Sequence, residues 1–158
     1  MFSKGKINDT DYNGKYEVDS DSVLMNSTFD GGIQLFFGLY DRYLFMDINS
    51  ETKQCYGLSI ILDAVKFKNV NYDLKEYEFF ELYNLECDER KLNICDEMEL
   101  NFYVDENNSL IIIGDLNCCE TPICFFDNTF AVIKGNKLKT LIIKVDSNII
   151  NSIKRNTI

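Results

Sequence analysis

The chain has 158 residues, of which 46% are hydrophobic and 27% charged, and its formal net charge is −10. This length suits one domain with its own core, and the composition excludes a disordered chain. The absence of histidine excludes Ser-His-Asp and Cys-His nucleophile pairs and histidine-ligated metals. Neither GxGxxG nor GxxxxGK[ST] occurs, so both standard phosphate-binding loops are missing. We therefore predict a protein that is not an enzyme, with no catalytic residue, metal or cofactor.

The N-terminal segment is polar from Ser3 and lacks the apolar stretch of a signal peptide. No apolar run is long enough to span a membrane. With Met1 as the start, we predict a cytoplasmic protein with no membrane partner and with six reduced cysteines. The spacings Cys87-x7-Cys95 and Cys118-Cys119-x4-Cys124 differ from the CxxC pairs of structural zinc. We expect these cysteines to fill the interior as small apolar residues, with a thiolate metal site as the alternative.

Residues 1–14 are rich in Lys, Asn, Asp and Gly, and they predict a mobile polar arm ahead of a single β-rich domain over residues 15–158. Within the arm, Asp9, Asp11 and Asn13 match the first half of an EF-hand calcium loop. The twelfth position of that loop is Ser20 instead of the required Glu. An arm rich in Asx turns is therefore the preferred interpretation, and a calcium site is the alternative.

Short apolar segments separated by turn residues follow the arm, a spacing typical of antiparallel sheets. The predicted strands span residues 33–40, 43–48, 55–62, 98–104, 110–113, 129–134 and 137–145. Residues 98–104 alternate strictly between apolar and polar side chains. Hairpin turns are expected at Asp41-Arg42 and at Gly135-Asn136, since Gly and Asn tolerate positive φ.

Helix signals are few. Ser147 is a candidate cap for a helix over residues 148–155, with Ile149, Ile150 and Ile153 on one side. Residues 73–83 fit a capped helix, but residues 77–83 fit a strand equally well, and we prefer the strand. The predicted fold is mainly β: a single-domain antiparallel sheet, as a sandwich, a rolled sheet or a small barrel, with a short C-terminal helix.

The charge is distributed unevenly. Residues 73–106 contain twelve acids and three bases, whereas residues 129–158 contain six bases and one acid. The functional interpretation is a recognition face for a basic protein surface, because complementary potentials raise association rates and select partners. The alternative is a solvated surface that keeps the chain in solution. The negative sign disfavours direct binding to nucleic acid.

Tyrosines lie among these acids, and tyrosine is enriched in binding hot spots. The acids of the connection 84–91 are expected to project together. The predicted partner-binding residues are Tyr77, Glu78, Glu81, Tyr83, Glu86, Asp88, Glu89, Glu97, Glu99 and Tyr103.

These features favour a non-enzymatic protein-binding module. The concrete form is an acidic inhibitor or immunity-type protein that covers a basic surface of a partner enzyme, such as a nuclease toxin or a host defence protein. The abundance of Asn, Ile and Lys is typical of a low-GC bacterium or its mobile elements. A small β-barrel carrier of an apolar ligand is the second hypothesis. An enzyme that uses a pair of carboxylates is the third.

Overall fold

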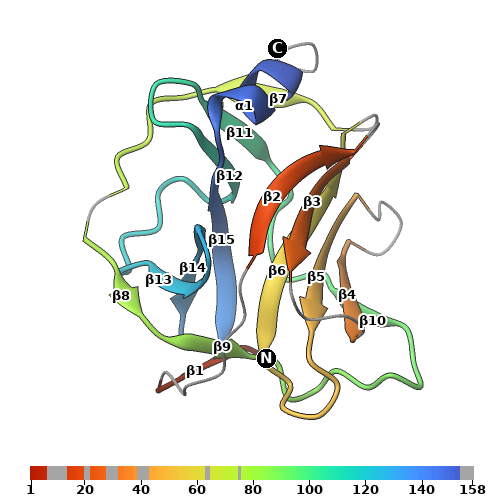
Figure 1. Cartoon of the computed structure of the whole chain (residues 1–158). Helices are drawn as coiled ribbons and strands as arrows, with labels where there is room; N and C mark the ends of the chain where they lie inside the picture. The colour runs from red at the N-terminus through yellow and green to blue at the C-terminus, as the bar shows by residue number, and fades with distance from the viewer. Residues whose placement is uncertain are drawn as a thin grey trace.

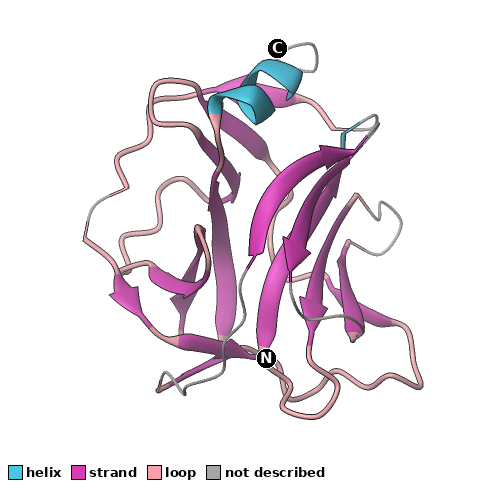
Figure 2. Cartoon of the chain, viewed as in Figure 1, coloured by secondary structure: helices cyan, strands magenta, loops and turns pink. Residues whose placement is uncertain are grey.

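A computed structural model gives the fold of the chain (Figure 1). It describes residues 1–6, 14–19, 22–27, 32–38, 43–62, 65–74 and 76–153. Strands dominate these residues, and the α-helix among them is the short α1 near the C-terminus (Figure 2). No helix among them has the length and apolar character needed to cross a membrane. The predicted mainly β fold with a short C-terminal helix is confirmed.

One large sheet has six strands in the order β10-β4-β5-β6-β3-β2. Its strands are β2 (Gly14–Asp19), β3 (Ser22–Ser27), β4 (Ile33–Phe37), β5 (Leu44–Ile48), β6 (Cys55–Ile61) and β10 (Asn93–Cys95). In β4, Ile33, Leu35 and Phe37 are buried and Gln34 is exposed. This period of two is the side-chain alternation of a strand with one face on the core.

The second large sheet has seven strands in the order β7-β11-β12-β15-β14-β13-β8. They are β7 (Phe67–Asn69), β8 (Glu78–Phe79), β11 (Phe102–Asp105), β12 (Leu110–Gly114), β13 (Ile123–Phe126), β14 (Thr129–Lys134) and β15 (Lys137–Lys144). A small sheet pairs β1 (Ser3–Gly5) with β9 (Glu81–Tyr83), and α1 spans Ser147–Ile153.

The two large sheets form two layers around one hydrophobic core (Figure 1). The Tyr16 hydroxyl in the six-stranded sheet lies 2.6 Å from the Thr129 hydroxyl in the seven-stranded sheet. Tyr56 and Phe126 meet edge to face across the same gap. Neither sheet closes on itself among the described strands, because each has two different edge strands. Of the three predicted architectures, the sandwich is therefore the one observed, and the small barrel is not.

The seven-stranded sheet is buried on both faces. Ile111 and Ile113 point into the main core, whereas Leu110 and Ile112 belong to a second cluster on the outer face. Partly buried side chains from other segments pack on that cluster: Val70, Tyr72, Leu74, Tyr103, Leu116, Cys118 and Cys124. Burial on both faces explains why β12 is continuously apolar.

The predicted hairpins agree with the observed antiparallel pairs β4–β5, β11–β12 and β14–β15. Residues 78–83 form β8 and β9, so the strand interpretation of this segment is correct. The turn residues Asp41-Arg42 lie outside the described residues. The strand predicted over residues 98–104 begins only at Phe102. The Asn101 amide donates to the Glu99 carbonyl at 3.2 Å, a local bond that replaces ladder pairing.

The C-terminal helix buries Ile149, Ile150 and Ile153, as predicted. Its cap is Asp146 and not Ser147, because the Asp146 carboxylate accepts a hydrogen bond from the Ile149 amide at 3.1 Å. Residues 154–158 lie outside the described residues.

The first residues of the predicted arm are docked on the body of the protein. Phe2 is only 1% exposed and packs in the main core. Residues Ser3–Gly5 pair antiparallel with β9, which ties this segment to the body of the protein. The apolar Phe2 side chain supplies the reason, since its burial favours docking of the segment. The residues of the candidate calcium loop, Asp9, Asp11 and Asn13, lie outside the described residues.

The segment from Phe67 to Cys95 runs around the perimeter of the molecule. It contributes β7 and β8 to the two edges of the seven-stranded sheet and β10 to one edge of the six-stranded sheet. All three strands pair parallel to their neighbours. These edges add parallel pairs to the mainly antiparallel sheets, because long connections, unlike tight hairpins, also permit parallel pairing.

Candidate functional site

The connection between β9 and β10 is held by two buried asparagines. The Asn93 side-chain carbonyl accepts a hydrogen bond from the Asp88 amide at 3.0 Å. Its amide group donates to the carbonyls of Asp88 at 2.9 Å and Lys91 at 3.2 Å. Asn84 accepts from the Glu86 amide at 3.2 Å through its side chain. The loop 84–92 therefore has a defined conformation in spite of its polar sequence.

Most of the predicted acids of this region are accessible. Glu86, Glu89, Glu97 and Glu99 are exposed, and Asp88 is half-buried. The Asp88 carboxylate accepts from the Arg90 amide at 2.9 Å and from its Nε at 3.4 Å. The backbone bond first, and then the side-chain bond, hold the pKa of Asp88 below its ordinary value. We call residues 84–99 the acidic surface segment.

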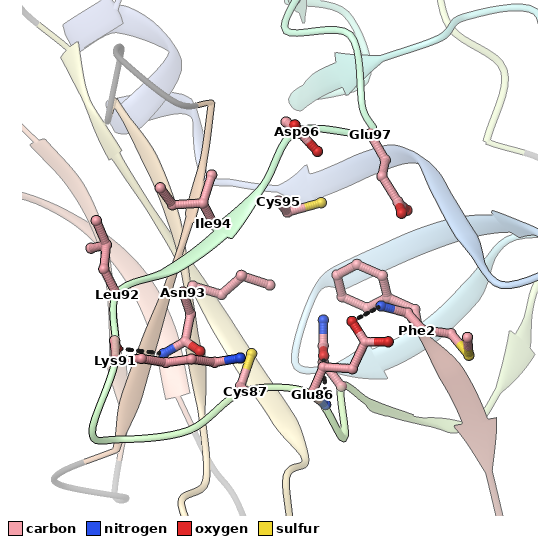
Figure 3. A pocket seen from close by; sticks show the side chains of 13 residues that line it. Phe2, Glu86, Cys87, Lys91, Leu92, Asn93, Ile94, Cys95, Asp96 and Glu97 are labelled. Atoms are coloured by element: carbon pink, nitrogen blue, oxygen red, sulfur yellow. Dashed lines mark hydrogen bonds and ion pairs between the residues drawn. The ribbon is translucent and has the colours of Figure 1, made fainter.

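A pocket of about 250 Å³ lies between this loop and β10 (Figure 3). The buried residues of its lining are Phe2, Leu35, Asn84, Cys87, Asn93 and Cys95, and Ile94 is half-buried. Exposed residues complete the lining: Met1, Glu86, Lys91, Leu92, Asp96 and Glu97. The predicted site residues Glu86 and Glu97 are thus brought together, although ten positions separate them in the chain.

The pocket thiols are not activated nucleophiles. Burial raises the pKa values of Cys87 and Cys95 above their ordinary value, and the opposing effect of Lys91 on Cys87 is smaller. A protonated thiol attacks poorly, since the thiolate is the nucleophile. Within the described ranges, no three His, Cys, Asp or Glu side chains are arranged to hold a metal ion.

Two exposed leucines in the same loop were not predicted as site residues from the sequence. Leu85 is 69% exposed and Leu92 is 52% exposed, although most apolar side chains of the chain are buried. Asp96, which is also exposed and lines the pocket, was not predicted as a site residue either. The only signal in the sequence was isolated apolar residues within a polar stretch. Such side chains next to charges can supply contact area for a partner.

Several predicted site residues do not join this surface. Glu81 is 4% exposed and accepts a hydrogen bond from the Tyr83 hydroxyl, so its side chain is not accessible to a partner. Tyr83 is half-buried, and its ring lies against Gly5. Tyr103 is half-buried on the outer face of the seven-stranded sheet. Alternation of tyrosine and acid along the chain therefore does not produce one face.

Tyr77 and Glu78 lie at the opposite edge of the seven-stranded sheet from Tyr103. Tyr77 is 42% exposed and contacts both Phe79 and Phe130 edge to face. Glu78 is exposed in β8, which pairs with β13. A second hollow nearby is lined by Tyr72, Asp73, Glu76 and residues 116–122. The acids of residues 73–106 thus fall into separate groups.

All six cysteines are free. Cys55, Cys87 and Cys95 are buried, which agrees with their predicted role as small apolar residues. Cys118 and Cys124 are half-buried in the outer cluster. Cys119 is exposed, contrary to the prediction, because it lies in a surface loop. Its thiol donates a hydrogen bond to the Asn117 carbonyl at 3.6 Å.

Asp47 is the carboxylate most affected by burial. It lies in β5 on the face opposite the core residues Met46 and Ile48. Desolvation raises its pKa to about 6. Its cross-strand neighbours are Gln34 and Gly57, neither of which is titratable. This arrangement does not provide the paired carboxylates that the enzyme hypothesis requires.

No protein-family model matches the chain, and no curated protein sequence matches it.

Proposed function

We propose that this chain is a non-enzymatic protein-binding module whose acidic surface segment, residues 84–99, covers a basic surface of a partner protein. The observation that carries the proposal is the combination of exposed acids with exposed Leu85 and Leu92 on a loop fixed by Asn93. The proposed biological form is an inhibitor or immunity-type protein whose partner is an enzyme, such as a nuclease toxin or a host defence protein.

The electrostatics of the surface support this role. Glu89 and Glu97 form no ion pair among the described residues, and the neighbouring Glu99 forms none either. Charges without local partners act over the Debye length of about 10 Å at 0.1 M salt and can steer a basic partner. The two exposed leucines add apolar surface, and its burial against a docked partner would contribute to the binding free energy.

The carrier hypothesis is less well supported. It requires a closed barrel with an apolar cavity, but the described sheets remain open and a continuous core occupies the space between them.

The test compares two charge-reversed variants with the unmodified chain. Glu89→Lys with Glu99→Lys alters the proposed surface, and Asp73→Lys with Glu120→Lys makes the same change in net charge elsewhere. All four side chains are exposed, so both variants are expected to fold. Each chain is immobilised and exposed to an extract of the source cells, and association with an isolated partner is then measured against salt.

We expect a partner that the unmodified chain and the control variant retain and that the surface variant loses. Its association rate should fall by roughly an order of magnitude as salt is raised, because steering is screened. Retention of the same proteins by all three chains, with rates independent of salt, would refute the proposal and favour a solvated surface.

A further inference from the structure

The pocket beside β10 has a size that limits its occupant. Its volume of about 250 Å³ is below the roughly 300–1,000 Å³ of pockets that hold a drug-sized ligand. The deepest side chains, Phe2 and Leu35, are 1% and 3% exposed, so they form a closed base. The pocket therefore offers room for a single side chain of a docked protein.

The charge of the pocket selects the kind of side chain. In Figure 3, the carboxylates of Glu86 and Glu97 extend from opposite sides toward the space beside Phe2. Asp96 adds a third acid at the rim, and Lys91 is the basic side chain of the lining. The thiol of Cys95, which is 8% exposed, points into the same space. The lining thus combines buried apolar and thiol groups with an excess of negative charge at the entrance.

We propose that this pocket receives one arginine side chain of the partner protein, an inference that rests on the proposed function. The apolar stem of arginine can lie against Leu92 and the buried base while its charged head stays near the rim. The planar guanidinium carries five N–H donors and can contact carboxylates on two sides at once, whereas the ammonium of lysine is a compact point charge. Carboxylates on both sides of the space therefore favour arginine.

Two cations of the chain itself already lie at this pocket. The Met1 ammonium lies 3.2 Å from the Glu86 carboxylate, and both groups are largely exposed. Lys91 lines the same pocket. An arriving guanidinium must compete with both, so Glu97 supplies the more available charge. Removal of the Lys91 charge should consequently strengthen binding, a result that a purely structural role of the pocket would not produce.

The test is an NMR titration of the full chain with N-acetyl-arginine methylamide at low salt. N-acetyl-citrulline methylamide, which has nearly the same shape without the charge, is the control probe. We expect saturable shifts of the amide signals of Glu86, Cys95 and Glu97 with the arginine probe, and about tenfold weaker binding of the citrulline probe. Shifts elsewhere, or equal binding of the two probes, would overturn the proposal.

Three exposed positions supply the variants. Glu97→Gln should weaken binding of the arginine probe by about threefold, and Lys91→Met should strengthen it by about twofold. Glu120→Gln, exposed and outside both the pocket lining and the acidic surface segment, should leave it unchanged. An equal loss in Glu97→Gln and Glu120→Gln would indicate general charge attraction and overturn the specific pocket.

The outcome for this pocket is separable from that for the proposed function. If the Glu89 and Glu99 reversals abolish partner binding but the arginine probe shows no saturable shifts at the pocket, the pocket proposal fails and the proposed function stands. If the arginine probe binds in the pocket while no partner depends on Glu89 and Glu99, the proposed function fails.

Discussion

Replacement of Asp47 by Asn is expected to stabilise the protein at alkaline pH. Desolvation raises the pKa of this carboxyl from its ordinary 3.8 to about 6. The native state therefore binds the proton more tightly than the unfolded state, so the stability due to this group is greatest below its unfolded pKa and is lost as the pH rises through 6. The difference of about two pKa units corresponds to about 3 kcal/mol of destabilisation at pH 8.

Asp47→Asn removes the charge and keeps the shape of the side chain. We expect its free energy of unfolding at pH 8 to exceed that of the unmodified chain by about 1–3 kcal/mol, since the buried amide retains part of the desolvation cost. At pH 5, where native Asp47 is mostly protonated, this advantage should shrink by about 1.4 kcal/mol.

The assay is urea unfolding followed by tyrosine fluorescence, because the chain has nine tyrosines and no tryptophan. Asp73→Asn, at an exposed position, is the matched control and should show no such dependence on pH. A gain of equal size at pH 5 and pH 8, or a loss of stability at pH 8, would refute the assignment of a desolvated carboxylate.

Three further predictions concern the loop, the seven-stranded sheet and the thiols. Asn93→Ala should lower the free energy of unfolding by about 2 kcal/mol in urea titrations, because Asp88 loses both bonds to this side chain; exposed Asn107→Ala should have little effect. Gly114→Ala should cost about 3 kcal/mol or more, since φ is +110° and the new Cβ would lie 2.3 Å from the Lys139 carbonyl oxygen; tolerance of alanine in thermal unfolding would contradict this geometry. In native protein, Ellman's reagent should modify Cys119 first and the three buried thiols only after unfolding; simultaneous reaction of all six would show that the core opens readily.

Local sequence patterns predicted the parts of the fold that local interactions determine. The hairpin around Gly135 follows from two alternating runs and a turn that accepts positive φ, and Gly135 has a φ of +64°. Helix α1 follows from the spacing of Ile149, Ile150 and Ile153. The perimeter segment could not be predicted in this way. Its strands have two or three residues each, and their partners lie far away in the chain.

The candidate site was predictable in part for the same reason. The exposure of Glu86, Glu89, Glu97 and Glu99 follows from their charge. The burial of Glu81 depends on the docking of β9 between other elements, which no local pattern reveals. The pocket is lined by Phe2 as well as by β10. It therefore forms only when the N-terminal segment and β10, which are far apart in the sequence, come together in the fold.

The short parallel strand β10 has a consequence for the dynamics of the molecule. It joins its sheet through three residues beside β4, and the Gly38 amide donates to the Cys95 carbonyl at 2.9 Å. Such a strand can detach in a local opening that costs far less than global unfolding, whereas β12 is paired on both sides. Each detachment of β10 would remove the side of the pocket that β10 forms. Hydrogen exchange at Gly38 would then report how often the pocket exists, and an occupant that binds only the closed form would slow that exchange.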